Sequence, residues 1–181
     1  ELLTANATQN INKPVIIPLN FKLKSTGEKL TVVKLDKKSF KEYKMAIVSI
    51  AETLYDQSPV LSLEFADTKT IDNDICYIAK LDGDVVGYIF AYEKDNKLNI
   101  NTVGISSSKG KKGVANALHW IVAREAQNRN INTIVAKEVD LTNESACKFL
   151  DEYGFVITRH SNNVRADFEA SAEEVLKNTS E

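Results

Sequence analysis

Cysteine, proline and methionine are scarce in this sequence of 181 residues, which has two cysteines, three prolines and one methionine. Cys76 and Cys147 lack the paired spacing of a zinc site, so no metal centre is predicted. We interpret both as buried, reduced thiols rather than as the halves of a disulfide. All three prolines lie at or before Pro59, so the later strands keep every backbone N–H that a core sheet needs.

Long apolar runs are also absent, because no stretch approaches the roughly 18 residues of a membrane-spanning helix. The net charge of −2 provides no broad basic surface, which argues against a general nucleic-acid-binding protein. The chain is 43% hydrophobic and 27% charged, a balance typical of one globular domain. It starts with Glu1 rather than methionine, which leaves a trimmed start, a removed leader and a longer parent protein as alternatives.

The start of the chain predicts a loose arm followed by a hairpin. Residues 1–13 are polar and lack periodicity, and the prolines that bound residues 14–18 suit an edge strand. A turn signal at residues 25–28 separates two apolar segments, residues 19–24 and 29–35, which predicts a hairpin.

A helical stripe follows at three- and four-residue spacing. Either Asp36 caps this helix, or Ser39 does so in a capping box with Glu42 three residues later. A shorter second helix is predicted over residues 60–65. The stripe consists of Phe40, Tyr43, Ile47, Ile50, Ala51 and Leu54.

The middle of the chain predicts three antiparallel strands. Residues 75–81 and 85–92 flank the turn dipeptide Asp82-Gly83, the clearest hairpin signal in the sequence. The third strand spans residues 98–105. An amphipathic helix over residues 113–129 then leads to a further strand, which we expect to lie parallel to the third because a helix connects them. The remaining predictions are that strand at residues 133–139, a hairpin of residues 156–158 and 164–168, and a helix over residues 171–178 with Ser171 and Glu174 in a capping box.

The connection between the third strand and the long helix is rich in Ser, Gly and Lys and contains no acid. Gly110 and Gly113 permit tight turns and leave backbone amides uncovered. These amides lie at a helix N-terminus, whose partial positive charge favours an anion. The segment therefore predicts a cradle for a phosphate or pyrophosphate. Its positive side chains are Lys109, Lys111 and Lys112.

Two common phosphate motifs do not fit this segment. A P-loop needs four residues between its glycines, whereas five separate Gly104 from Gly110. The dinucleotide fingerprint needs Gly-x-Gly-x-x-Gly, and no such triplet of glycines occurs here.

A third motif does fit: Ile105, followed by residues 110–115, resembles the acetyl-CoA loop of the GNAT superfamily of N-acetyltransferases. The departure is Gly110, where that family usually has Arg or Gln, and Lys109 is the candidate to replace it. A second segment strengthens the resemblance, and the two together cover residues 97–158. In this second segment the positions in register with the family's next motif are Asn143, Ala146, Gly154 and Phe155.

The resemblance implies an α/β GNAT fold. We expect a central mixed, mostly antiparallel sheet of about six to seven strands, flanked by about four helices. Two strands of this sheet are expected to splay apart and admit the cofactor's pantetheine arm. The implied organisation is an N-terminal extension with an edge strand at residues 1–28, the acetyltransferase domain at residues 29–170, and a helix or tail at residues 171–181.

The implied function is transfer of an acetyl group from acetyl-CoA to a primary amine, by direct attack in a ternary complex. Backbone N–H groups near Val103 are expected to stabilise the thioester oxygen, and Asn143 to hold the cofactor arm or the helix start. The cofactor-binding residues implied are Val103, Gly104, Ile105, Lys109, Gly110, Lys111, Lys112, Gly113, Val114, Ala115, Asn143, Phe149 and Leu150.

Glu138 is the candidate general base, because some family members that acetylate protein N-termini carry Glu at this spacing. A dry cleft would raise its pKa; the alternative is a solvent-facing strand residue, and Asp140 is the second candidate. The family's usual acid, a tyrosine, is replaced here by Leu150, which cannot donate a proton. Tyr153, about one helical turn later, is the candidate acid, with a packing role as the alternative. For His119 we expect packing.

The acceptor is not specified by the sequence. An acidic mouth would favour a cationic amine, although a solvated surface explains the same acids. Leu150 and Gly110 favour an alternative function, a CoA-binding regulatory module without turnover, and Leu150 would also suit a longer acyl group. We expect acetyl-CoA and an amine as partners, no nucleic acid or membrane, a monomer or homodimer, and a cytoplasmic location. The acids of the expected mouth are Glu52, Asp56, Glu64 and Asp67.

Overall fold

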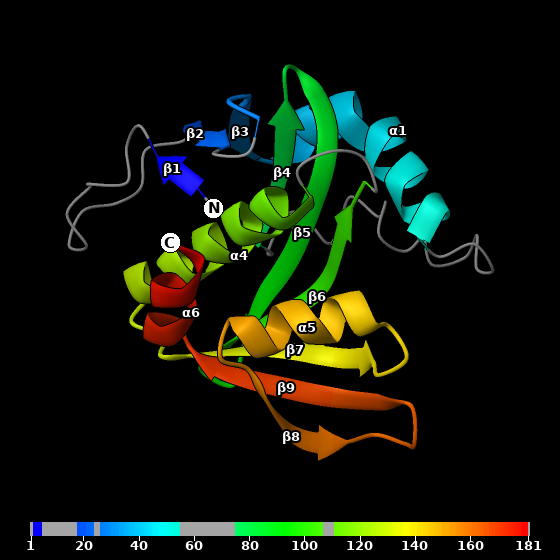
Figure 1. Cartoon of the computed structure of the whole chain (residues 1–181), viewed down its shortest axis with the longest axis vertical. Helices are drawn as coiled ribbons and strands as arrows, with labels where there is room; N and C mark the ends of the chain where they lie inside the picture. The colour runs from blue at the N-terminus through cyan, green and yellow to red at the C-terminus, as the bar shows by residue number, and fades with distance from the viewer. Residues whose placement is uncertain (1, 5–17, 24–25, 55–74, 107–110, 181) are drawn as a thin grey trace.

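The computed structural model describes residues 2–4, 18–23, 26–54, 75–106 and 111–180 (Figure 1). Four helices and nine strands occur within these residues. In chain order they are β1 (Leu2–Thr4), β2 (Leu19–Leu23), β3 (Lys29–Lys34), α1 (Lys37–Leu54), β4 (Ile75–Leu81), β5 (Asp84–Lys94), β6 (Lys97–Ile105), α4 (Lys111–Asn128), β7 (Thr133–Asp140), α5 (Glu144–Glu152), β8 (Val156–His160), β9 (Arg165–Ser171) and α6 (Ala172–Thr179).

All nine strands form one sheet, in the order β1-β2-β3-β4-β5-β6-β7-β9-β8. Only the pair β6 and β7 is parallel, so the predicted mixed, mostly antiparallel sheet is confirmed. The sheet is wider than predicted, partly because β1 lies within the arm that was expected to be loose. Leu2 pairs with Leu23 of β2, so that expectation was wrong for residues 2–4. The helix expected at residues 60–65 lies outside the described residues, as does the edge strand expected at residues 14–18 except for Pro18.

The predicted hairpins are present. Leu19 of β2 pairs with Val32 of β3, and β4 pairs with β5 around Asp82 and Gly83, both of which have positive φ. Asp95 and Asn96 adopt the same left-handed conformation between β5 and β6, as a tight hairpin turn requires.

The start of α1 distinguishes between the two predicted caps, Asp36 and Ser39. Oδ1 of Asp36 accepts a hydrogen bond from the Ser39 N–H at 2.8 Å, and Oγ of Ser39 accepts one from the Asp36 N–H at 2.8 Å. Asp36 is therefore the cap, and Ser39 is its partner three residues later. The capping box proposed for Ser39 and Glu42 lies one turn too far along the chain, because the Asp36 carboxylate already caps the first turn of α1.

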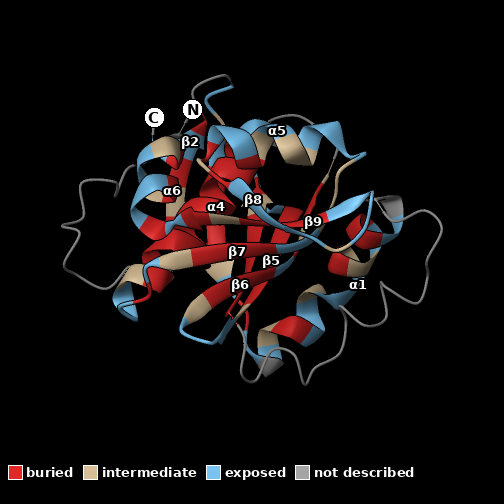
Figure 2. Ribbon diagram, turned by 90° about the horizontal axis from the view of Figure 1, so that it is seen from below, coloured by how far each residue is buried: buried red, intermediate tan, exposed pale blue. Residues whose placement is uncertain are grey.

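The helices cover both faces of the sheet (Figure 1). On one face Phe40, Ile47 and Ala51 of α1 pack into a buried cluster with Tyr88 and Phe90 of β5. On the other face α4 contributes a larger cluster that includes Val114, Leu118, Ile121 and Val122. Figure 2 shows the buried residues concentrated where the sheet lies between these helices.

The strands β6 and β7 separate soon after they meet. Their pairing consists of Leu98 with Ile134, Asn99 with Val135, and Ile100 with Ala136. Beyond these three pairs β6 continues to Ile105 and β7 to Asp140, and the two strands diverge (Figure 1). The splayed pair expected from the sequence resemblance is therefore present.

A salt bridge crosses the sheet close to this junction. Nζ of Lys97, on β6, lies 2.7 Å from Oε1 of Glu169, on β9. This hydrogen bond lowers the pKa of Glu169. Because β7 lies between β6 and β9 in the sheet, the bridge joins the two strands that flank it.

Candidate functional site: the separation of β6 and β7

The carboxyl half of β6 uses only one of its edges for strand pairing. On one side Val103 pairs with Ile89, Gly104 with Tyr88, and Ile105 with Gly87 of β5. On the other side, within the described part of the chain, no strand pairs with β6 beyond Ile100. Every second peptide group of residues 103–105 thus points toward the gap, where an extended ligand could bond to it.

Two glycines allow close packing around this half of β6. A Cβ at Gly104 would lie 2.3 Å from Cε1 of Tyr88, and a Cβ at Gly87 would lie 2.9 Å from Cγ1 of Val114. Gly104 therefore accommodates the Tyr88 ring on the α1 face, and Gly87 lets the first turns of α4 rest against β5. Neither contact could be found from the sequence, because each depends on a partner from another element.

The helix α4 begins at Lys111, two residues before the predicted start, and Gly113, Val114 and Ala115 are buried. Lys112 is exposed, and its Nζ lies 3.8 Å from Oε2 of Glu152 on α5. The helix N-terminus thus follows the free half of β6, where its positive end favours an anion. Lys109 and Gly110 lie outside the described residues, as does the side chain of Lys111.

Asn143 performs one of the two roles expected of it. Its Oδ1 accepts a hydrogen bond from the Ala146 N–H at 3.1 Å and caps α5.

Leu150 is 6% exposed and belongs to the main core, with the half-buried Phe149 packed against the same core. Asn143 therefore holds the helix start, and α5 lies along β7 (Figure 1).

Tyr153 is 1% exposed, and its hydroxyl donates a hydrogen bond to Oδ1 of Asn116 at 2.6 Å. Burial raises the pKa of this phenol. Its ring lies 4.8 Å from the His119 ring. These contacts favour the packing interpretation of Tyr153, and its role as the acid stays a prediction.

His119 packs as expected. It is 6% exposed, its Nδ1 lies 2.7 Å from the carbonyl oxygen of Ala115, and burial lowers its pKa to about 4. The ring is therefore neutral at physiological pH, with Nδ1 as the donor.

Glu138 lies two residues beyond Ala136, the last residue of β7 that pairs with β6. Its side chain is exposed, and Oε1 accepts a hydrogen bond from Oγ of Ser161 at 2.7 Å. The dry surroundings expected for this carboxylate are therefore not present. Exposure instead leaves it accessible to an amine from solvent, and its catalytic role stays a prediction.

Asp140, the second candidate base, is held in a local turn. Its Oδ1 accepts hydrogen bonds from the Thr142 hydroxyl at 2.7 Å and from the Thr142 N–H at 2.9 Å. These bonds lower the pKa of Asp140, which makes it a weaker base. Its role as the second candidate base stays a prediction.

Of the acids expected around the acceptor, only Glu52 lies within the described residues, where it is exposed near the end of α1. Asp56, Glu64 and Asp67 lie outside them. The exposed surface of α1 also carries Lys38, Lys41 and Lys44, so the described part of this helix is not an acidic surface.

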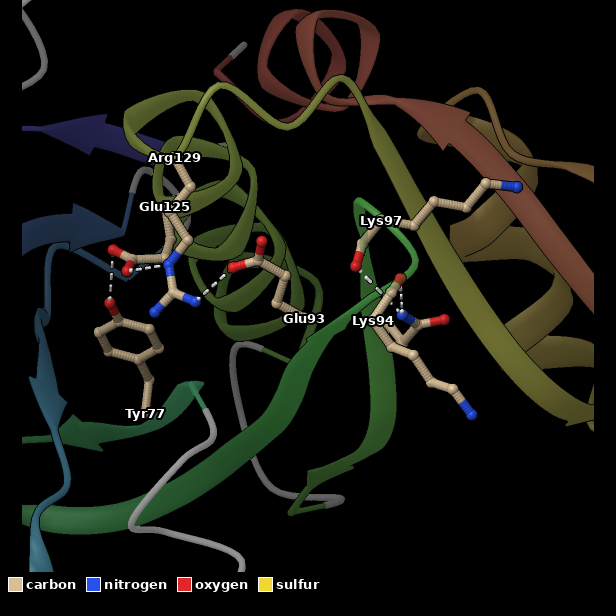
Figure 3. Close-up of polar contacts among 7 residues, drawn as sticks. Tyr77, Glu93, Lys94, Lys97, Glu125 and Arg129 are labelled. Carbon is tan, nitrogen blue, oxygen red and sulfur yellow. Dashed lines mark hydrogen bonds and ion pairs between the residues drawn. The ribbon is translucent and has the colours of Figure 1, made fainter.

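A polar network missed by the sequence reasoning fixes the other end of α4 (Figure 3). Arg129 donates to Glu125 at 2.9 Å and to Glu93 of β5 at 3.1 Å. The Tyr77 hydroxyl lies 3.5 Å from Oε2 of Glu125. The four-residue spacing of Glu125 and Arg129 was a signal for their pair, but the strand partners could not be found from spacing.

The described residues contain no group of three or more His, Cys, Asp or Glu side chains placed to hold a metal ion. Neither Cys76 nor Cys147 forms a disulfide; Cys76 is buried as expected, whereas Cys147 is only half-buried. Across the same described segments, no helix has the length and apolarity needed to cross a membrane.

Solved structures share this fold. The PaiA N-acetyltransferase of Thermoplasma acidophilum, in complex with coenzyme A, is 13% identical at a TM-score of 0.66, over 78% of this chain and 98% of that one. The aminoglycoside 6'-N-acetyltransferase of Enterococcus faecium is 14% identical at 0.63, over 78% and 96%. A putative streptothricin acetyltransferase of Bacillus anthracis, in complex with acetyl coenzyme A, is 25% identical at 0.52, over 57% and 66%.

A comparison with curated proteins finds no match. The profile of the acetyltransferase (GNAT) family, by contrast, matches residues 43–155. These residues contain the diverging strands, the start of α4 and the whole of α5. Because the match covers more than half of the sequence, the chain belongs to the acetyltransferase (GNAT) family.

Proposed function

We propose that this protein is an N-acetyltransferase that transfers an acetyl group from acetyl-CoA to a primary amine. The observation that carries the proposal is the separation of β6 and β7 after three residue pairs, directly before a helix N-terminus. A strand edge without a neighbouring strand suits an extended arm with amide groups, and a helix N-terminus suits a pyrophosphate. The neighbours solved with coenzyme A or acetyl coenzyme A support the same ligand.

The residues present fit this ligand. The backbone of residues 103–105 would hold the extended arm, and the first turn of α4 would hold the pyrophosphate. From α5, Asn143 keeps the helix start in place, while Phe149 and Leu150 add an apolar wall. The residues proposed for the loop and first turn are Lys109, Gly110, Lys111, Lys112, Gly113, Val114 and Ala115.

When bound, acetyl-CoA supplies a thioester, which is an activated acyl group open to direct attack by an amine. A backbone N–H of residues 103–105 would donate to its carbonyl oxygen as negative charge develops there. Glu138 would accept the proton of the substrate ammonium, since only the neutral amine attacks. Tyr153 is the candidate donor for the departing thiolate, although its hydroxyl is bonded to Asn116.

A second candidate function is a CoA-binding module without turnover. The observation that favours it is the absence of a proton donor at the usual position, since Leu150 is buried there and Tyr153 points its hydroxyl at another helix. Binding of acetyl-CoA is common to both candidates, and release of free thiol with an amine distinguishes them.

The first experiment is calorimetric titration with acetyl-CoA and, separately, free CoA. We expect both to bind and Lys112→Glu, at the start of α4, to weaken binding about 3- to 10-fold through charge reversal at the pyrophosphate. Lys94→Glu, which makes the same change in the distant β5–β6 turn, should bind like wild type. Absence of binding by both ligands would overturn the site.

Turnover is measured next, as thiol release with spermidine, kanamycin and a lysine-free peptide with a free N-terminus. Release with any of these amines supports the transferase. Tight binding without release from any amine supports the module.

A further inference from the structure

Glu138 occupies a backbone position that side chains rarely adopt. Between Ala136 and Val139 on β7 there are three steps, whereas the paired residues Phe168 and Ala166 on β9 are two steps apart. One extra residue is therefore inserted into β7, as in a β-bulge. Within this bulge Glu138 has a φ of +52°, a conformation that costs an ordinary residue free energy but suits glycine.

The hairpin of β8 and β9 holds Glu138 at three points. Oδ1 of Asp167 accepts the Glu138 N–H at 2.9 Å, and Nη1 of Arg165 donates to the Glu138 carbonyl oxygen at 3.0 Å. Oγ of Ser161 donates to the Glu138 carboxylate at 2.7 Å. Both backbone groups of the bulged residue and its side chain are thus fixed by side chains of one neighbouring hairpin.

Asp167 differs from the other two partners because it is buried. It is 6% exposed and is the only acid among the buried residues of the described segments. Burying a carboxylate is costly unless it accepts hydrogen bonds. Its bond to the Glu138 N–H replaces the strand partner that the bulge removes. The same hydrogen bond thus satisfies both the buried carboxylate and the N–H of the strained residue.

A bulge that served only to bend β7 would be less strained with glycine in the left-handed position. Strained residues persist where the surrounding contacts over-determine them, and they cluster at functional sites. Here the strained residue is also the candidate base, and it lies two residues past the last pair of β6 and β7.

We propose that Asp167 is a positioning residue that acts through Glu138: by accepting the Glu138 N–H, it holds the bulge, and with it the Glu138 carboxylate, in the position from which Glu138 acts as the base. The inference rests on the proposed function, because only transfer to an amine needs the base. Asp167 itself contacts neither substrate.

The strain is tested by thermal unfolding, without any acceptor. Glu138→Gly relieves the left-handed conformation, so we expect the melting temperature to rise by about 2 to 4 °C. Lys137→Gly, the matched control at the preceding residue, should lower it. An equal fall in melting temperature in the two variants would contradict the claim that Glu138 is strained.

The role of Asp167 in holding the bulge is tested by amide hydrogen exchange at Glu138. Asp167→Asn keeps an acceptor oxygen of the same shape, so protection should be retained. Asp167→Ala removes the acceptor, and exchange should accelerate at least about tenfold. Unchanged exchange in Asp167→Ala would overturn the inference.

The kinetic test uses whichever amine gives thiol release with the full chain. Glu138→Gln should lower kcat about 100-fold, as expected for loss of a general base. Asp167→Ala should lower kcat about tenfold through misplacement of that base, with the KM for acetyl-CoA within about twofold of wild type. Asp167→Asn should restore most of the rate.

A double variant separates positioning from a merely structural role. If Asp167 acts through Glu138, adding Asp167→Ala to Glu138→Gln should cost no further activity. If Asp167→Ala still lowers kcat about tenfold in the Glu138→Gln background, the positioning role would be overturned, while Glu138 would remain the base. A wild-type kcat for Glu138→Gln would instead overturn the base, and with it the inference, while acetyl-CoA binding would still support the cofactor site.

Discussion

The hydroxyl of Tyr153 donates a hydrogen bond to Oδ1 of Asn116 at 2.6 Å, which joins the end of α5 to the first half of α4. Both helices border the proposed cofactor site, so this contact fixes the distance between its two sides. The contact also decides how the candidate acid can be tested, because it gives Tyr153 a structural role that can be measured separately.

We expect Tyr153→Phe to lower the free energy of unfolding by about 1 to 2 kcal/mol, since Oδ1 of the buried Asn116 loses the hydrogen bond from the Tyr153 hydroxyl. If Tyr153 only packs, kcat per folded molecule should stay within about twofold of wild type. Denaturant unfolding and thiol release measure the two effects. Tyr92→Phe, on β5, is the control. A large loss of kcat without loss of stability would instead support the acid role.

Acid should destabilise the protein through His119. Its pKa in the fold is about 4, lowered by burial from the ordinary 6.5. The unfolded chain therefore takes up a proton first as the pH falls. Stability from the neutral ring is complete above pH 6.5 and is lost progressively down to about pH 4, by about 3 kcal/mol in total.

Unfolding in denaturant between pH 7 and pH 4 measures this loss. His119→Gln should flatten the dependence, whereas His160→Gln, on the exposed strand β8, should leave most of it. An equally steep dependence in His119→Gln would contradict the assignment.

Gly104→Ala should be one of the more harmful substitutions near the site. The new Cβ would lie 2.3 Å from the Tyr88 ring, both residues are buried, and overpacking of this kind costs about 1 to 3 kcal/mol. Gly83→Ala provides a contrast, because it has a φ of +91° but no atom within 4 Å of the new Cβ. Its cost should be limited to about 1 kcal/mol of backbone strain. Thermal unfolding ranks the two.

The cap of α1 offers a direct test of the corrected assignment. Asp36→Ala should lower the midpoint of urea unfolding, because it removes the acceptor for the Ser39 N–H. Glu42→Ala, which would matter under the earlier capping-box hypothesis, should change stability by less than about 0.5 kcal/mol. Equal effects in urea unfolding would contradict this assignment.

Patterns confined to one element predicted most of the fold. The dipeptide Asp82-Gly83 gave the central hairpin, the stripe from Phe40 to Ala51 gave α1, and Ser171 with Glu174 gave the start of α6, where the bond is 3.1 Å. In each case the signal and the structure lie within a few residues of one another. The strand β1 escaped prediction because three residues give no periodicity, and only its pairing with β2 makes it a strand.

In the candidate site, too, features set within one element could be predicted, whereas contacts between elements could not. Asn143 was found because a cap and a family motif both act over short spacing. The positive φ of Glu138 and its contacts with Asp167 and Arg165 depend on a hairpin 23 or more residues later, so no local pattern reveals them. The placement of Tyr153 likewise depends on α4, 37 residues earlier in the chain.

Only three residue pairs connect β6 to β7. Few backbone hydrogen bonds therefore join the two parts of the sheet, strands β1 to β6 and strands β7 to β9. The helix α4 and the Lys97–Glu169 bridge, next to the first of these pairs, add to this connection. A ligand that bonds to the free edge of β6 would extend this connection. Backbone amides in β7 and β9 should then exchange their hydrogens more slowly. In the proposed complex, the ligand would therefore take the place of a strand partner along the second half of β6.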